Sequence, residues 1–315
     1  MIRLLAGALG VFTFVGLTVA QVAPPVPNAP GAPQGFGPPR TLAPIVIGPP
    51  APVPAEVAIP RPTPEELMQV NDALANWIST NTSAAKPLLQ KFQPLMMLQK
   101  PHLNVAATYT QTAQRMGPRH LEFVEKARKG DIDLLLDGDS ITDWWLQGDA
   151  NKAVFDKYFG KMKTADFAIA GDTTQGVLWG LKNGEGQGFQ PKAIMLMIGT
   201  NNMGGSTAPE IAEGVGAVVL EMRNDFPDAR ILLLAIFPRS TPNDPVRDKI
   251  ADANRIISKL EDHQHVFYMD IGAEFLGDTG RFLPDSFRPD NLHPQAKGYD
   301  IWGAAVKDKL AELMK

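Results

Sequence analysis

Short apolar runs alternate with helical segments through the second half of the chain, and this alternation limits the possible folds more than any other feature. The runs are Ile132–Leu136, Phe167–Ala170, Ala193–Ile198, Ile231–Phe237 and Val266–Ile271. Helices are predicted at Ala150–Gly160, Thr174–Leu181, Pro209–Asp225, Asp244–Glu261 and Gly298–Met314. Continuous apolar strands separated by helices are typical of a parallel sheet that is covered on both faces. We therefore expect an α/β domain over residues 131–315.

The composition excludes several kinds of site. The chain contains no Cys, so a disulfide, a thiolate zinc site and a cysteine nucleophile are all ruled out. Its formal net charge is −4, which gives no indication of binding to nucleic acid or to an anionic membrane surface. Any side-chain nucleophile or metal ligand must therefore be a group other than a thiol.

The first residues are typical of a secretory signal peptide. Arg3 precedes an uncharged apolar run from Leu4 to Ala20, which ends in a small-x-small pattern before Gln21. We expect residues 1–20 to be removed and the protein to be secreted or periplasmic, without stable membrane insertion. The alternative is an uncleaved membrane anchor, although the run is shorter than the ~20 apolar residues that usually span a bilayer.

Two further segments precede the α/β domain. Residues 21–62 are rich in Pro, which lacks an N–H and has a fixed φ, so we expect a disordered, extended linker. Residues 63–130 are predicted to form an α-helical lead-in. Its first helix begins with Thr63 as the N-cap, Pro64 at the first helical position and Glu66 at the third.

Polar motifs follow the first three predicted strands, and a fourth motif lies near the C-terminus. They are Gly138-Asp139-Ser140, Gly171-Asp172-Thr173, Gly199-Thr200-Asn201-Asn202 and Asp290-Asn291-Leu292-His293. Because ligands of parallel sheets bind beyond the carboxyl ends of the strands, we expect these motifs to converge on one edge. Together they offer a hydroxyl, backbone N–H groups, a carboxamide, an imidazole and a carboxylate, which are the groups that acyl transfer requires.

The spacing of Asp290 and His293 favours a base and its orienting carboxylate. Three residues apart on a helical turn, the two side chains lie on the same face. The carboxylate can then hold one imidazole nitrogen while the other nitrogen faces Ser140. The alternative is that Asp290 only caps its own turn.

These motifs resemble the blocks of the SGNH, or GDSL-type, hydrolases, with the closest resemblance to platelet-activating-factor acetylhydrolase catalytic subunits and related bacterial acetyl and carbohydrate esterases. Many members have Asn-Asp in the third block, whereas this chain has Asn201-Asn202, as that subgroup does. The resemblance implies a flavodoxin-like three-layer α/β/α sandwich with five parallel strands. It also implies Ser140 as nucleophile, His293 as base and Asp290 as orienter, and it implies no cofactor and no metal.

The resemblance further implies an oxyanion hole made of the Ser140 N–H, the Gly171 N–H and the Asn201 side-chain amide. Around these residues several roles stay open. Three tryptophans near the motifs could line a substrate pocket or pack in the core, and Arg239 could anchor the site or touch substrate. The tryptophans are Trp144, Trp145 and Trp179. The other histidines are His102, His120, His263 and His265, and of these only His265 has an Asp three residues earlier, Asp262.

The sequence therefore predicts a secreted serine esterase that removes short acyl groups, acetyl above all, from carbohydrate esters. The alternatives are a lipid or phospholipid acyl ester hydrolase and a carbohydrate-binding module without activity. The expected partners are small-molecule or polysaccharide esters.

Overall fold

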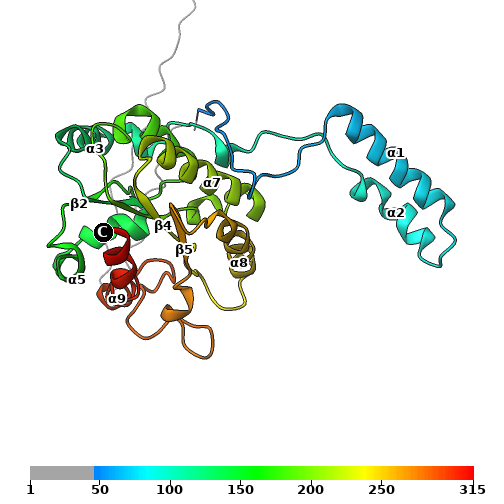
Figure 1. Cartoon of the computed structure of the whole chain (residues 1–315). Coiled ribbons are helices and arrows are strands. Elements are labelled where there is room, and N and C mark those ends of the chain that lie inside the picture. The colour runs from blue at the N-terminus through cyan, green and yellow to red at the C-terminus, as the bar shows by residue number, and fades with distance from the viewer. Residues whose placement is uncertain (1–45) are drawn as a thin grey trace, which may run out of the picture. The chain divides into compact units, whose positions relative to one another are not determined.

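A five-stranded parallel sheet forms the centre of the computed structural model, which describes residues 46–315 (Figure 1). The strands are β1 (Leu134–Gly138), β2 (Thr164–Asp166), β3 (Ala193–Met197), β4 (Arg230–Leu234) and β5 (Val266–Met269). Their order across the sheet is β2-β1-β3-β4-β5, and every neighbouring pair is parallel. This order is that of flavodoxin-like sheets, so the predicted fold is confirmed.

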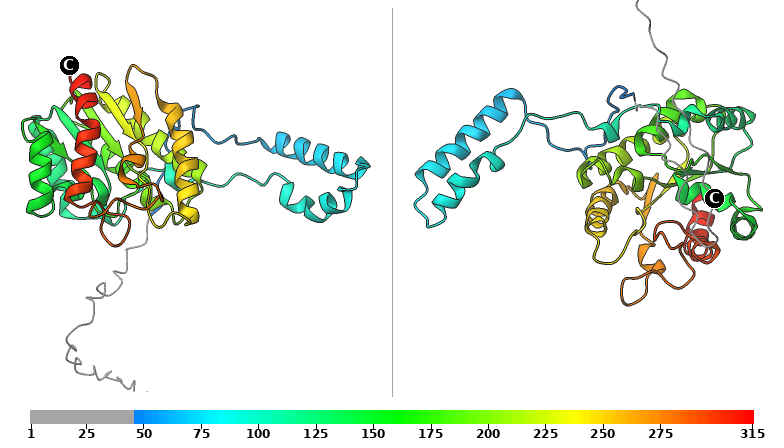
Figure 2. Two further views of the ribbon diagram at one scale, coloured as in Figure 1. Left: turned by 90° about the horizontal axis from the view of Figure 1, so that it is seen from below. Right: turned by 180° about the vertical axis from the view of Figure 1, so that it is seen from behind.

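Helices cover both faces of the sheet, as the views in Figure 2 show. The helices of the described residues are α1 (Pro64–Thr80), α2 (Lys86–Met96), α3 (Pro118–Lys129), α4 (Ser140–Asp143), α5 (Asp149–Phe159), α6 (Thr174–Gly180), α7 (Ala208–Asp225), α8 (Pro245–Ile257) and α9 (Ala296–Leu313), of which α1 and α2 contribute no residue to the core around the sheet. Alternate strand residues point to opposite faces, so Leu135 packs in the core with α3, α6, α7 and α8. Leu134 and Leu136 pack in a second core with α5 and α9. None of the helices in residues 46–315 is both long and apolar enough to cross a bilayer.

The second strand differs from its prediction. We expected it at Phe167–Ala170, but it spans Thr164–Asp166. Past Asp166 the bonds to β1 weaken: the Phe167 N–H still donates to the Leu136 carbonyl at 2.9 Å, but the Ile169 N–H lies 3.4 Å from the Gly138 carbonyl. The Ala168 N–H, on the other edge, is accepted by the Asp166 side chain at 2.9 Å. Phe167 and Ala168 are nevertheless fully buried. The apolar run therefore correctly indicated a buried segment, but this segment is a loop and not the predicted strand.

The end of the Pro-rich segment is not a free linker. Residues 46–62 contain no helix or strand, as expected from their prolines, but they pack against the α/β domain. Val57 is buried, the Gly48 N–H donates to Thr110 Oγ1 at 2.9 Å, and the Ala51 N–H donates to the Ala107 carbonyl at 2.8 Å. The expectation of a disordered linker through residue 62 is thus wrong for residues 46–62. The predicted signal peptide and the first part of the predicted linker lie outside the described residues.

The first two helices form a hairpin. The Thr63 hydroxyl accepts the Glu66 N–H, and the Glu66 carboxylate accepts the Thr63 N–H, so the predicted start of α1 is confirmed. The hairpin is held at its open end by Asn71, whose amide exchanges two hydrogen bonds with the Leu98 backbone. The remainder of the lead-in, including α3, belongs to the main core through Phe123 and Ala127.

A buried ionic cluster joins the lead-in to the sheet. Arg115 is fully buried and bonds Asp172, at 2.7 Å, and Glu185. Its guanidinium also lies 3.6 Å from Asp137 of β1, and His120 Nδ1 lies 2.6 Å from Glu185. Burial alone would lower the pKa of Arg115, but the three carboxylates raise the pKa above its usual value. The single positive charge of Arg115 thus offsets the negative charge of carboxyl groups from three separate segments.

Replacing Arg115 tests the contribution of this cluster. Arg115→Ala leaves the carboxylates without their counter-charge in a dry interior, so we expect a loss of about 3–5 kcal/mol in the free energy of unfolding. Urea denaturation measures it. Arg128→Ala, an exposed arginine on α3, is the matched control and should change stability by less than ~0.5 kcal/mol. A loss below ~1 kcal/mol for Arg115→Ala would contradict the stabilising role.

Candidate active site

Ser140 lies at the carboxyl end of β1, where the chain turns into α4. The turn requires Gly138, because a Cβ there would approach the Met197 carbonyl oxygen to 2.4 Å. Asp139 caps α4 by accepting the Ile141 N–H at 3.0 Å, which agrees with a structural role for this carboxylate. Burial raises the pKa of Asp139 to about 7. The local sequence thus fixes the Ser140 hydroxyl at the edge of the sheet.

His293 and Asp290 complete a continuous hydrogen-bond chain with Ser140. Ser140 Oγ lies 2.9 Å from His293 Nε2, and His293 Nδ1 lies 2.7 Å from Asp290 Oδ2. Burial tends to raise the pKa of Asp290, but hydrogen bonds from the His293 ring and from the His293 and Leu292 N–H groups lower it. The carboxylate therefore stays ionised beside the imidazole.

The turn that carries these residues is not the helical turn that we expected. Asn291 has a φ of 52°, and Asp290 Oδ1 accepts the N–H groups of Leu292 and His293 at 2.9 and 3.1 Å. This side-chain-capped turn places Asp290 and His293 together without a helix. Asp290 therefore caps its turn and bonds the imidazole at once, so capping is not its only contact.

The candidate oxyanion donors follow the two strands beside β1. Gly171, with a φ of 82°, follows β2, and Asn201 follows β3. The Asn201 amide donates to the Asp172 carbonyl at 2.8 Å, which ties the two loops together and leaves a second N–H on the same nitrogen. Arg239 anchors this region, since it donates to the Thr200 carbonyl at 3.1 Å.

Asn202 has a structural role that explains why it is an amide. Its Oδ1 accepts the Thr174 N–H at the start of α6, at 3.2 Å, and its Nδ2 donates to Gln175 Oε1 at 2.9 Å. An aspartate could accept the first bond but could not donate the second. The residue therefore connects the second and third motifs.

The three tryptophans have different positions. Trp145 is fully buried in the core between the sheet, α5 and α9, and Trp179 packs on His120 with ring centroids 4.7 Å apart. Trp144 stacks on the His293 ring at 4.0 Å, and the Arg288 guanidinium lies 4.4 Å above the Trp144 ring. Of the three, Trp144 is thus the one placed beside the candidate base.

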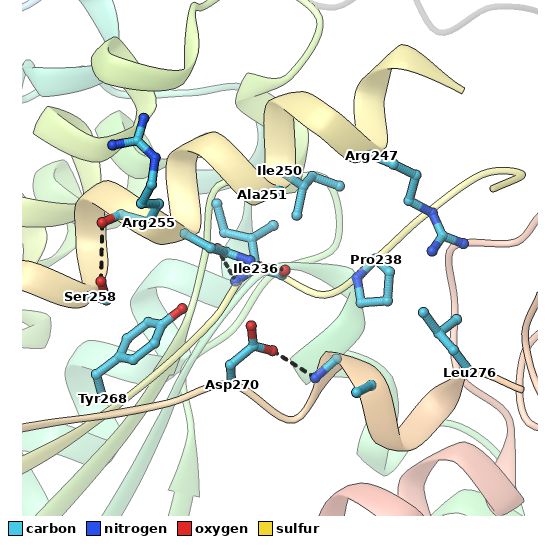
Figure 3. A pocket seen from close by; sticks show the side chains of 13 residues that line it. Ile236, Pro238, Arg247, Ile250, Ala251, Arg255, Ser258, Tyr268, Asp270 and Leu276 are labelled. Atoms are coloured by element: carbon cyan, nitrogen blue, oxygen red, sulfur yellow. Dashed lines mark hydrogen bonds between the residues drawn. The ribbon is translucent and has the colours of Figure 1, made fainter. Parts of the chain in front are cut away.

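Other candidate sites are distinct from this one. In residues 46–315, no group of three or more His, Cys, Asp or Glu side chains is arranged to hold a metal ion. A cavity of about 540 Å³ lies between α8 and the ends of β4 and β5 (Figure 3). It is lined by residues such as Arg247, Tyr268 and Asp270, and it does not include Ser140 or His293.

Residues 138–301 match the GDSL-like lipase/acylhydrolase family, and the chain belongs to this family of ester hydrolases. The predicted family is thereby confirmed. Platelet-activating factor acetylhydrolase IB subunit alpha2 of Rattus norvegicus is 34% identical over 196 residues, which cover 62% of this chain and 82% of the relative. Subunit alpha1 of Homo sapiens is 29% identical over the same shares of the two chains.

The fold has a counterpart among solved structures. A protein from Streptococcus pneumonia, whose description refers to platelet activating factor, superposes with a TM-score of 0.50 at 22% identity. The superposition covers 61% of this chain and 92% of that chain. At this identity the likeness shows the fold alone.

Sequence reasoning missed two contributors to the site. Arg288 was not considered, and Arg115 lies in the lead-in, outside the motifs, although it bonds Asp172 beside Gly171. No local pattern marks either residue, because each acts through a partner that is distant in sequence.

Removing the Trp144 ring tests whether the stack holds His293 in place. An aromatic stack contributes ~0.5–1.5 kcal/mol, so we expect Trp144→Ala to lower kcat for p-nitrophenyl acetate by about 10-fold with a smaller change in KM. Trp144→Phe keeps a stacking ring and should recover most of the rate. Trp179→Ala is the control and should leave kcat within ~3-fold. An equal loss in both alanine variants would count against a specific role for the stack.

Proposed function

We propose that the protein hydrolyses short acyl esters, acetyl esters above all, through an acyl-serine intermediate. The observation that carries the proposal is the unbroken chain Asp290–His293–Ser140, with bonds of 2.7 and 2.9 Å. It unites a nucleophile, a base and an orienting carboxylate at the edge of the sheet.

The reaction proceeds in two halves. His293 Nε2 takes the proton as Ser140 Oγ attacks the ester carbonyl, and it then gives that proton to the departing alcohol oxygen when the ester C–O bond breaks. Water next attacks the acyl-serine, with His293 again as base, and releases the acid and free Ser140. Asp290 holds the tautomer and stabilises the imidazolium.

Three N–H groups stabilise the oxyanion in this scheme: the backbone N–H groups of Ser140 and Gly171 and the Asn201 side-chain amide. They follow β1, β2 and β3, which are neighbours in the sheet and end at the same edge. Donors of this kind are fixed before the reaction, and one donor is typically worth ~10²–10³ in rate. The support for the three roles is their position and the tie between Asn201 and Asp172.

The substrate that we propose is an acetylated carbohydrate outside the cytoplasm. Its support is the predicted signal peptide and Pro-rich segment at residues 1–62, which suit an exported enzyme. A second candidate is an acetylated lipid, which is favoured by the names of relatives that are 34% identical to this chain. A carbohydrate-binding module without activity fits less well, because binding alone does not require the Asp290–His293–Ser140 chain.

Replacing the nucleophile tests the mechanism. Ser140→Ala removes the attacking oxygen, so we expect hydrolysis of p-nitrophenyl acetate to fall by at least ~10³-fold and fluorophosphonate labelling to disappear. Ser258→Ala, a serine of the Ser258–Leu260 turn, is the matched control and should retain both. Undiminished hydrolysis by Ser140→Ala would refute the acyl-serine route.

A substrate panel separates the two ester classes. Acetate release from acetylated xylan oligosaccharides should exceed release from an acetylated ether phospholipid by about 10-fold or more in kcat/KM. The Ser140→Ala variant serves as the blank for both. The reverse order of rates would replace the carbohydrate proposal with the lipid one, while the acyl-serine mechanism would stand.

A further inference from the structure

Two residues after β4, Arg239 and Ser240, contact both halves of the candidate active site. The Arg239 guanidinium donates to the Thr200 carbonyl at 3.1 Å and lies 3.3 Å from Thr200 Oγ1. Thr200 directly precedes Asn201, the candidate oxyanion amide. The Ser240 N–H donates to the Asn291 carbonyl at 2.8 Å, within the turn that carries the base. We call Arg239 and Ser240 the joining segment, because they connect the oxyanion loop with that turn.

The joining segment has a backbone conformation that needs support. Ser240 has a φ of 62°, in the left-handed region, and Asn291, which accepts its N–H, has a φ of 52°. Such conformations persist where the surrounding contacts determine them. Ser240 Oγ bonds Asp244 Oδ2 at 2.5 Å, and Asp244 caps α8 by accepting the Val246 N–H at 2.9 Å. The start of α8 therefore holds the joining segment from the side away from the candidate site.

Arg247, in the first turn of α8, bonds both carbonyls of the joining segment. Its Nε donates to the Arg239 carbonyl at 2.5 Å, and its Nη2 donates to the Ser240 carbonyl at 2.9 Å. A guanidinium carries its donors in a rigid fork, so it fixes two successive carbonyls relative to each other. The guanidinium also lies 5.2 Å from the centroid of the Phe282 ring, which stacks on Phe287 just before the turn that carries the base.

We propose that Arg247 is a positioning residue for the ester hydrolysis proposed above. It makes no hydrogen bond to Ser140 or His293, so it acts through the joining segment. By holding that segment, Arg247 keeps the oxyanion loop and the turn of the base in register with each other. The inference rests on the proposed function, because this register matters only if Ser140 attacks an ester.

A second arginine of α8 provides a comparison. Arg255 lines the same cavity of about 540 Å³ as Arg247, and Figure 3 shows the two side chains toward opposite ends of that cavity. The Arg255 side chain is 67% exposed and pairs with Asp252 at 3.3 Å, and it bonds neither residue of the joining segment. The two arginines thus share a helix, a charge and a cavity, and they differ in their contact with the joining segment.

Steady-state kinetics of Arg247→Ala with p-nitrophenyl acetate test the positioning role. Small misplacements of reacting groups are costly to rate, so we expect kcat to fall by ~10–100-fold while KM stays within ~3-fold. Arg255→Ala is the matched control and should keep the wild-type kcat. An unchanged kcat in Arg247→Ala, or equal losses in both variants, would overturn the proposal.

Titration with a fluorophosphonate separates misplacement from unfolding. The reagent labels Ser140 in folded chains, so prolonged labelling counts the competent sites and kcat can be expressed per labelled site. We expect Arg247→Ala to be labelled more slowly than the wild type but to the same final extent, with a reduced kcat per site. Fewer labelled sites with the wild-type kcat per site would mean that Arg247 only stabilises the fold, which would overturn the positioning role.

Two further variants test whether the effect runs through the joining segment. Arg247→Lys keeps the charge but lacks the fork, so it cannot hold both carbonyls in the same way and its kcat should lie between those of wild type and Arg247→Ala. Arg239→Ala/Arg247→Ala should lose much less than the product of the two single losses, because both residues act through one segment. Single losses that multiply in full would show independent routes and contradict the inference.

The wild-type chain distinguishes failure of this inference from failure of the proposed function. If the wild type hydrolyses p-nitrophenyl acetate and Ser140→Ala does not, the acyl-serine mechanism stands, and the Arg247→Ala result decides the positioning role alone. If the wild type neither hydrolyses the ester nor reacts with the fluorophosphonate, the proposed function fails and the positioning role fails with it.

Discussion

The parallel alignment of three neighbouring strands is the constraint on which the rest of the site depends. β2, β1 and β3 lie side by side and end at one edge, so the loops that carry Gly171, Ser140 and Asn201 must meet there. Each loop has its own local reason for its conformation, such as the close approach of Gly138 to the Met197 carbonyl. The Asp290–His293 turn is the one part of the site that comes from outside this sheet edge, and it must be held by contacts of its own.

Those contacts come from both ends of the turn. The Arg288 N–H donates to the His293 carbonyl at 2.8 Å and closes the turn, while the Arg288 side chain lies over Trp144. The Trp144 ring also stacks on the His293 ring, with the centroids 4.0 Å apart. Trp144, directly after α4, therefore contacts both Arg288 and His293, whose backbones close the turn that carries the base. In this way the segment that positions the hydroxyl of Ser140 also positions its partner imidazole.

The sequence predicted the fold and the candidate site residues where the signal was local. Strand–helix alternation and glycine-terminated strands are read within a few residues, so the sheet and the placement of Ser140 at a strand end were predicted. The predictions failed where tertiary contacts determine the conformation. The apolar run at 167–170 is a buried loop and not a strand. Residues 46–62 are not a free linker, because they pack against the domain through bonds to partners such as Thr110. A capped turn also replaces the helical turn at Asp290, because a three-residue spacing is compatible with both.

Part of the lead-in is bonded to the loops that carry the candidate site and is not only a spacer before them. Arg115, which precedes the family match at residue 138, bonds the Asp172 carboxylate, and the Asp172 carbonyl accepts the Asn201 amide. A line of direct bonds thus runs from a buried guanidinium in the lead-in to the candidate oxyanion amide. If the chain were cut at residue 131, the carboxylates of Asp172, Glu185 and Asp137 would share a dry interior without a cation. The domain boundary predicted at residue 131 therefore divides the buried ionic cluster around Arg115. The hairpin at residues 64–96 contributes no charged side chain to this cluster.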